Sequence, residues 1–345
     1  MFISLKWTDA NPSRPLSSTQ IFIESLEHSG FGKASSFFCD EYIYMRRRQC
    51  DEAIIQMCLQ ERPDFLFLMP TQLDVSITFN DEPPERRQSY ALFPRNETLR
   101  LLKELTQIPM ITCVGDAYGE AAFNRFESML PFSDKILLLE PASDFLRKTR
   151  SPDKYACLWC PVVHKTFNRK DSQNQDINVS FIGRTFPANP GQIPLQDNPL
   201  HQYAYRDIFL QELTARGIPV FCAGGAQRAV PLSLNQVADY FRRSKISLNF
   251  SYSSPGVHLL RGRIWEAINC GSLLFEEENS AITQFLEPMR HFVPFSGIED
   301  AVSKIHYFLG NERLRRQIAD AGHRVVSQKY NASSFWEKTI NLALS

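Results

Sequence analysis

Apolar residues follow two alternating patterns along most of the chain. Short continuous runs such as FLFLM (65–69) are typical of strands buried on both faces of a sheet. Between them, apolar residues recur at helical spacing, as Leu99, Leu102 and Leu105 do. In the first half this predicts strands at 2–7, 36–44, 65–69, 110–116, 135–140 and 155–161, of which 36–44 is either a strand or an extended piece. It predicts helices at 17–28, 51–60, 95–106, 119–130 and 143–148, with Asp51 as the N-cap of the second. Strands separated by helices indicate a parallel sheet covered on both faces.

The pattern lapses over 163–176, a polar stretch without periodicity that predicts a linker. It then restarts and predicts strands at 177–183, 218–225, 246–250, 272–277 and 292–295, and helices at 203–216, 234–244, 261–269, 298–309, 311–328 and 332–344. A length of 345 residues also favours two domains, at roughly 100–200 residues for each. We therefore expect two doubly wound α/β domains, at 1–162 and 177–330, and a C-terminal helix over 331–345 that can pack back on the N-terminal domain.

Charge and composition narrow the class of protein. Lys and Arg together number 38, as do Asp and Glu, and this zero net charge argues against a general nucleic-acid binder. No apolar run approaches the roughly 18 residues of a membrane span, and the N-terminus lacks a signal-peptide pattern. The eight cysteines are scattered, which favours reduced core residues and a cytoplasmic protein. Cys157 and Cys160 have redox-motif spacing, but they lie in a predicted strand, and no second pair completes a zinc site.

The stretch 244–276 carries the clearest candidate chemistry, because it reads as strand, loop, helix and strand. A loop after a parallel strand that opens onto a helix N-terminus is an anion site, since free N–H groups and the helix dipole point at it. Arg261 and Arg263 fall in the first turn of the predicted helix, where the dipole disfavours cations. A bound anion would compensate for this pair. Glycines that allow tight turns follow several predicted strands, at Gly115, Gly183, Gly224, Gly225 and Gly256.

The second half resembles a known family. The succession SFIGRTF, VFCAGG, SKISLNFS and LRGRIWEAINCGSLLFEE is similar to GT-B glycosyltransferases, in particular to the "glycosyltransferase group 1" type that includes the CgeB-like spore-maturation proteins. The resemblance covers about 177–335, and its most specific part is R-x-x-E-A-x-x-C-G-S-L-L, from Arg263 to Leu274. It implies two Rossmann-like domains facing a central cleft, with a nucleotide-sugar bound mainly by the C-terminal domain and the acceptor mainly by the N-terminal one.

The resemblance also implies roles for individual residues. Glu266 corresponds to the second glutamate of the family's E-x7-E pattern, which holds the nucleotide ribose; the first would fall at position 258, which holds His258. His258 is a candidate general base or a candidate hydrogen-bond donor to the phosphates, or else a loop histidine without a functional role. Asp116, after a predicted buried strand, is a candidate base on the acceptor side or a helix cap. The expected donor-binding residues are Glu266, Arg263, Arg261, Gly183, Arg184, Gly224, Ser251 and Gly256.

The resulting functional hypothesis is a glycosyltransferase that moves a sugar from a nucleotide-diphosphate sugar to a hydroxyl of a saccharide, lipid-linked or protein acceptor, with retention of configuration. No cofactor beyond the donor substrate is expected. The carboxylates of 80–85 lie among prolines in a predicted exposed loop, and no D-x-D motif follows a strand, so no metal site is expected. Arginines and helix N-termini would take the place of the ion at the diphosphate. One alternative is a non-catalytic nucleotide- or sugar-binding protein on the same fold, because His258 stands where the family pattern has its first glutamate. Another is an epimerase or phosphorylase on this fold.

Overall fold

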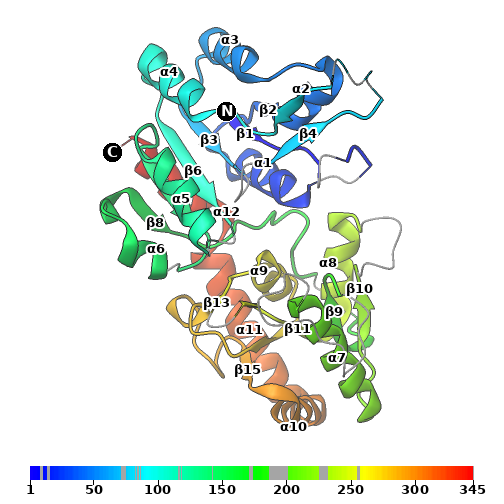
Figure 1. Cartoon of the computed structure of the whole chain (residues 1–345). Helices are drawn as coiled ribbons and strands as arrows, with labels where there is room; N and C mark the ends of the chain where they lie inside the picture. Colours follow the sequence, from blue (N-terminus) through cyan, green and yellow to red (C-terminus); the bar gives the residue numbers. More distant parts are fainter. Residues whose placement is uncertain are drawn as a thin grey trace. The chain divides into compact units, whose positions relative to one another are not determined.

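The chain forms two compact units, each built on a parallel sheet (Figure 1). Unit 1 consists of Met1–Trp159 and Ser333–Ser345, and unit 2 of Cys160–Ala332. The computed structural model of the protein describes residues 1–7, 11–13, 16–70, 75–81, 83, 85, 87–115, 117, 119–141, 143–170, 174–185, 201–224, 232–254 and 257–344.

Unit 1 contains, within its described residues, a six-stranded parallel sheet in the order β2-β1-β3-β6-β7-β8. Its strands are β1 (Phe2–Ser4), β2 (Ser36–Phe38), β3 (Leu66–Leu68), β6 (Met110–Val114), β7 (Lys135–Leu138) and β8 (Tyr155–Cys157), with a separate hairpin of β4 (Ser76–Thr78) and β5 (Ser89–Ala91). Its helices are α1 (Ser17–Ser29), α2 (Cys39–Arg46), α3 (Asp51–Glu61), α4 (Asn96–Thr106), α5 (Glu120–Met129), α6 (Ser143–Lys148) and α12 (Ala332–Leu344), with a 3₁₀ turn at Pro152–Lys154.

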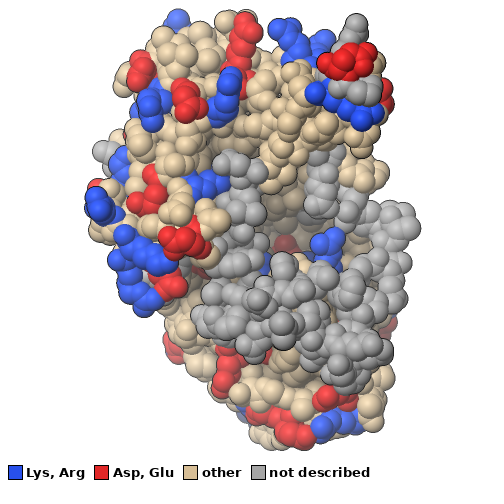
Figure 2. Space-filling model, viewed as in Figure 1, with Lys and Arg blue, Asp and Glu red and all other residues tan. Residues whose placement is uncertain are grey.

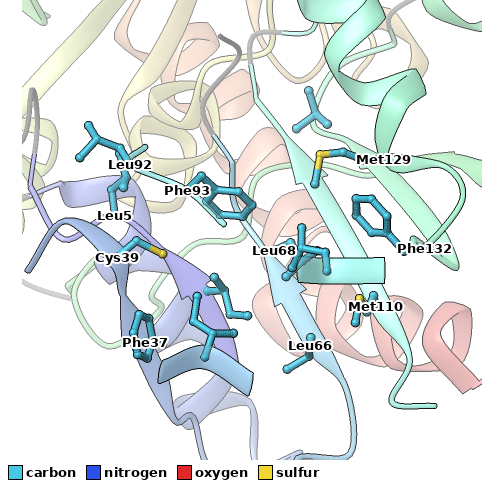
Figure 3. Packing of buried hydrophobic residues seen from close by; sticks show 14 of the residues in the cluster. Leu5, Phe37, Cys39, Leu66, Leu68, Leu92, Phe93, Met110, Met129 and Phe132 are labelled. Carbon is cyan, nitrogen blue, oxygen red and sulfur yellow. The ribbon is translucent and has the colours of Figure 1, made fainter. Parts of the chain in front are cut away.

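The core of unit 1 lies between this sheet and its helices. Every residue of β3 and β6 is buried, as their continuous apolar runs predict. Leu66, Leu68 and Met110 from these adjacent strands belong to the same buried cluster as Met129, the last residue of α5, and Phe132, which follows it (Figure 3). The expected alternation of strand and helix is therefore confirmed for unit 1, although most of the strands are shorter than the apolar runs that predict them.

Two local predictions for unit 1 are wrong. The stretch 36–44 is extended only to Phe38 and then forms helix α2. Asp40 explains the change, because its carboxylate accepts backbone hydrogen bonds from Lys6 (2.8 Å) and Trp7 (2.9 Å) and places negative charge in the first turn of α2. Asp51 is not the N-cap of α3, since Cys50 takes that place.

The carboxylate of Asp51 instead serves the next helix along the chain. It accepts a hydrogen bond from the backbone N–H of Arg95 (3.1 Å), the N-cap residue of α4, and another from the Thr98 hydroxyl. Asp51 therefore links the start of α3 to the start of α4 and satisfies an amide at the α4 terminus.

The C-terminal helix α12 packs within unit 1, although it follows unit 2 in the chain. Trp336 is fully buried, and its ring meets those of Phe2 and Phe67 edge-on, at centroid distances of 5.7 and 5.1 Å. Its indole N–H donates to the hydroxyl of Ser25 at 2.9 Å. The chain therefore enters unit 2 after Trp159 and returns to unit 1 at Ser333.

Unit 2 contains, within its described residues, a five-stranded parallel sheet in the order β10-β9-β11-β14-β15. The strands are β9 (Ile177–Ile182), β10 (Phe221–Ala223), β11 (Ser244–Asn249), β14 (Leu273–Glu277) and β15 (Val293–Phe295), with a small hairpin of β12 (Tyr252–Ser254) and β13 (Val257–His258) after β11. The helices are α7 (His201–Ala215), α8 (Leu234–Arg243), α9 (Gly262–Asn269), α10 (Gly297–Gly310) and α11 (Glu312–Lys329), with a 3₁₀ turn at Ile282–Gln284. This matches the predicted order of elements, and the β12–β13 hairpin is an addition to it.

The surface charges, the helices and the cysteines can each be compared with what the composition predicts. Basic and acidic side chains are interspersed on the face that Figure 2 shows. Among the helices of the described residues, none combines the length and apolar character needed to cross a membrane. All cysteines are free: Cys39, Cys50, Cys58, Cys113 and Cys270 are buried as predicted, Cys157 and Cys160 are half-buried, and Cys222 is exposed. Cys222 differs because β10 is an edge strand of its sheet.

Candidate functional site

The candidate site lies at the carboxyl edge of the sheet in unit 2. The strand order reverses between β9 and β11, and ligands of doubly wound sheets bind outside the carboxyl ends of the strands at such a switch point. Gly183 follows β9, Gly224 follows β10, and Ser251 lies two residues beyond β11. The fold thus brings together, along one edge, three residues that the sequence places far apart.

Gly183 and Gly224 lie against each other at this edge. A Cβ atom on Gly224 would sit 3.6 Å from the backbone nitrogen of Gly183, and Gly224 has φ of +82°. A Cβ atom on Gly183 would come within 2.8 Å of the Phe181 ring. A larger residue at either position would therefore strain the backbone or fill this corner. Glycine at both positions leaves room for a ligand to approach the backbone closely.

Helix α9 places its N-terminus at the same edge. Arg261 is the N-cap residue, and the first turn contains Arg263 and no acidic residue. Gly271 closes the other end with φ of +83°, as the sequence predicts. The expected pair of arginines at the start of this helix is therefore confirmed, with Arg261 at the N-cap rather than inside the first turn.

A third arginine, which the sequence analysis did not single out as a site residue, joins this pair. Arg206 of α7 is only 5% exposed, and its guanidinium donates to the backbone carbonyl of Phe250 (3.0 Å) and to Oε1 of Gln202 (3.1 Å). The Arg261 guanidinium also donates to Oε1 of Gln202, at 3.5 Å. Gln202 therefore bridges the two guanidinium groups. The ring of Tyr203 lies 5.4 Å from Arg206 and 5.9 Å from Arg184, which brings the exposed Arg184 to the same side.

The electrostatics of this cluster favour a bound anion. Burial, followed by the positive charges of Arg261 and Arg263, lowers the pKa of Arg206 to about 10. Nε of Arg206 is buried and has no hydrogen-bond partner among the described residues. Glu277 is the nearby carboxylate, but Tyr205 already donates to it at 2.6 Å, and burial raises its pKa. A diphosphate would add negative charge beside Arg206 and an acceptor for its Nε atom, and the arginine fork suits it.

Glu266 lies one turn into α9 and is 8% exposed. Its Oε1 atom is 3.5 Å from the position of a Cβ atom on Gly262, so the carboxylate lies along the first turn of the helix. Burial raises the pKa of Glu266 to about 7, while the charge of Arg263 opposes this shift. A buried carboxylate beside a cation can accept hydrogen bonds from two vicinal hydroxyls.

A second buried carboxylate was not predicted. Glu276 of β14 is fully buried beside Asn249 of β11 and accepts hydrogen bonds from the Asn249 amide (2.7 Å), the Asn279 amide (3.5 Å) and the Ser251 hydroxyl. This network fixes Ser251, the residue that precedes the β12–β13 hairpin. Glu276 therefore positions the chain that leads from β11 into the β12–β13 hairpin.

Burial raises the pKa of Glu276 to about 8, against the three hydrogen bonds that lower it. Because the folded protein binds this proton more tightly than the unfolded chain, the contribution of Glu276 to stability falls as the pH rises between 4.5 and about 8. We expect Glu276→Gln to reduce the pH dependence of the free energy of unfolding, measured by urea denaturation across this range. Glu278→Gln, at an exposed position, is the matched control. Equal slopes for the two variants would contradict this role.

Three of the expected site residues lie wholly or partly outside the described part of the chain. Asp116 and Gly256 lie outside the described residues. His258 is described by its backbone only, which pairs with Tyr252 in the β12–β13 hairpin. Ser251 is buried at the site edge, with its hydroxyl engaged by Glu276. Among the described residues, no group of three or more His, Cys, Asp or Glu side chains is arranged to hold a metal ion.

Comparisons with known proteins define the class of fold. The chain is similar to the crystal structure of HepE from Anabaena in complex with UDP and glucose, with 10% sequence identity, a TM-score of 0.59 and coverage of 99% of both chains. A glycosyltransferase of Rickettsia africae gives 10% identity, a TM-score of 0.58 and coverage of 99% of this chain and 97% of that one. Sucrose-phosphate synthase of Thermosynechococcus elongatus gives 11% identity, a TM-score of 0.51 and coverage of 100% of this chain and 99% of that one. The fold is thus that of GT-B glycosyltransferases, as predicted.

The sequence comparison is narrower. Residues 206–341 match the family model described as "Glycosyl transferase-like", which covers Arg206, Arg261, Arg263, Glu266 and Glu276. No curated protein matches the chain in sequence. The comparisons therefore support the predicted glycosyltransferase type for this part of the chain, and the resemblance to the CgeB-like group remains a prediction.

Proposed function

We propose that the protein is a glycosyltransferase that transfers a sugar from a nucleotide-diphosphate sugar to an acceptor hydroxyl. The observation that carries this proposal is the gathering of Arg206, Arg261 and Arg263 beside the buried carboxylate of Glu266, at the switch point of the sheet. These groups match the two polar parts of a nucleotide diphosphate, its phosphates and its ribose diol. The match of residues 206–341 to a glycosyl transferase-like model supports the same function.

In this proposal the arginines hold the diphosphate, and Glu266 accepts hydrogen bonds from the ribose hydroxyls. Gly183 and Gly224 allow the phosphates to approach the backbone, and Arg184, Ser251 and Gly256 complete the donor site. The crystal structures of HepE contain UDP or UDP-glucose, which makes a uridine-diphosphate sugar the first donor to test.

The chemistry that the site supports is stabilisation of the leaving group. The bond between the anomeric carbon and the diphosphate oxygen breaks, a bond to the acceptor oxygen forms, and the acceptor proton passes to a base. Negative charge develops on the diphosphate, where preorganised guanidinium groups stabilise it in place of a metal ion. His258 and Asp116 remain the candidate bases, and retention of configuration is proposed from the resemblance around Glu266. We further propose a cytoplasmic enzyme that acts on a saccharide, lipid-linked or protein acceptor in polysaccharide or glycoconjugate biosynthesis.

A thermal-shift panel of nucleotide-diphosphate sugars tests the proposal. One nucleotide class should raise the unfolding temperature of the wild type, because a ligand that binds only the folded state stabilises it. Arg261→Gln/Arg263→Gln should lose this shift, whereas Arg313→Gln/Arg324→Gln, which removes the same charge from exposed positions of α11, should keep it.

The outcomes separate the alternatives. Stabilisation by no nucleotide sugar would contradict the proposal. Stabilisation without donor hydrolysis, and without transfer to any fraction of a saccharide, lipid or protein extract, would instead indicate a non-catalytic nucleotide-binding protein on the same fold.

A further inference from the structure

A pocket lies at the amino-terminal ends of the strands in unit 2, opposite the carboxyl edge that carries the candidate donor site. It is lined by the cationic side chains of Arg169, Lys170, Lys245, Arg315 and Arg316, and by one carboxylate, Asp320, among the described residues. Lys245 is the second residue of β11, whereas Ser251 lies beyond the other end of this strand. At roughly 3.3 Å per residue, the six intervening steps separate the pocket from the candidate donor site by about 20 Å. The pocket is therefore a second and separate concentration of positive charge.

Arg315 is the most informative member of this lining. The residue is only 4% exposed, yet its nearest carboxylate, that of Glu312, lies 4.0 Å away. The same oxygen of Glu312 makes a closer ion pair, at 2.6 Å, with Arg316. Burial lowers the pKa of Arg315, Glu312 opposes the shift, and Arg316 adds to it. A nearly buried guanidinium with so distant a counter-charge, at the wall of a pocket, indicates an anion that is supplied from outside.

The rest of the wall indicates the size and kind of this anion. Arg169 pairs with Asp320, and its side chain lies over Gly271, where a Cβ atom would meet the Arg169 Cδ atom at 3.2 Å. Gln175 donates to the carbonyls of Ser244 (3.0 Å) and Gly271 (3.3 Å), so these carbonyls do not face the pocket without a donor. The described lining residues include no aromatic ring on which a base or sugar could stack. The pocket therefore suits a compact phosphate group rather than a whole nucleotide.

We propose that this pocket binds the phosphate group of a small ligand, either a soluble phosphorylated compound or a phosphomonoester lipid headgroup. Arg315 and Arg169 provide planar forks for the phosphate oxygens, and Lys245, Lys170 and Arg316 provide further positive charge. The site is independent of the proposed transferase activity, because none of its residues belongs to the donor site.

Isothermal titration calorimetry with pyrophosphate, at fixed ionic strength on the full chain, tests this proposal. The Arg263→Gln variant serves as the background, because this change should weaken pyrophosphate binding at the candidate donor site. In that background, adding Lys245→Gln and Arg316→Gln should weaken the remaining binding by about tenfold or more, the usual effect of losing charge-assisted contacts. Adding Arg313→Gln and Arg324→Gln removes the same charge elsewhere on the surface and should leave the affinity nearly unchanged.

Equal affinities of these two variants, or no saturable binding in the Arg263→Gln background, would overturn the proposal. Vesicles of phosphatidylcholine with and without phosphatidic acid identify the source of the phosphate. Sedimentation with phosphatidic acid that pyrophosphate abolishes assigns a lipid headgroup, whereas pyrophosphate binding without sedimentation assigns a soluble ligand. Both results can be obtained even if no nucleotide sugar binds, so the outcome is distinct from that of the proposed transferase function.

Discussion

Replacing Arg206 with Gln should lower kcat/KM for the nucleotide-sugar donor by about a hundredfold or more, because a preorganised donor to developing negative charge is typically worth that much. The same change should not lower the unfolding temperature appreciably. It removes a buried charge that Arg261 and Arg263 repel, and the Gln amide keeps a hydrogen-bond donor for this region. Steady-state kinetics and a thermal scan of the ligand-free protein measure the two effects together.

Arg216→Gln is the matched control for Arg206→Gln. Arg216 lies just beyond the end of the same helix, α7, is exposed, and pairs with Glu299 on the surface. Its loss should leave donor kinetics unchanged. If Arg206→Gln retained wild-type kinetics, the arginine cluster would not be the diphosphate site. A large fall in unfolding temperature together with lost activity would assign Arg206 a structural role instead.

Changing Glu266 to Gln should weaken donor binding by about tenfold, because a neutral amide cannot accept two charge-assisted hydrogen bonds from a ribose diol. The pH dependence is the sharper signature. Since the pKa of Glu266 in the free protein is about 7, the ionised form that binds the diol becomes available as the pH rises through neutrality. Wild-type affinity for a nucleotide sugar should therefore increase from pH 6 to pH 8, with release of a proton, and the Gln variant should lack this increase.

Calorimetry in buffers of different ionisation enthalpy measures both the affinity and the proton release. Glu212→Gln, at an exposed position of α7, should behave like the wild type. A wild-type affinity that stays constant across neutrality, or falls, would show that Glu266 does not bind the donor in its ionised form.

Much of the fold could be predicted because its signals are local. Continuous apolar runs such as those of β3 and β6 mark buried parallel strands, and helical spacing marks the helices between them. The failures arise where contacts between distant parts of the chain decide the local structure. The stretch 36–44 contains apolar residues compatible with a strand, but the structure holds Asp40, in the first turn of α2, by backbone hydrogen bonds from Lys6 and Trp7, which the sequence does not place beside it.

Part of the candidate site could be predicted: the stretch around helix α9 from its local pattern, and Gly183, Gly224 and Ser251 from strand ends and the resemblance. Arg261 and Arg263 lie at the start of one predicted helix, so the local pattern reveals them, and the resemblance adds Glu266 from the same stretch. Arg206 is 55 positions before Arg261 and joins it only through the packing of α7 at the sheet edge. Glu276 was missed for the same reason, since its role depends on strand pairing with Asn249.

A crystal structure with the nucleotide sugar that gives the largest thermal shift tests the central claim most directly. We expect the diphosphate oxygens within hydrogen-bonding distance of the guanidinium groups of Arg206, Arg261 and Arg263, and both ribose hydroxyls on the carboxylate of Glu266. A nucleotide bound elsewhere, with these four side chains free of contact to it, would contradict the account.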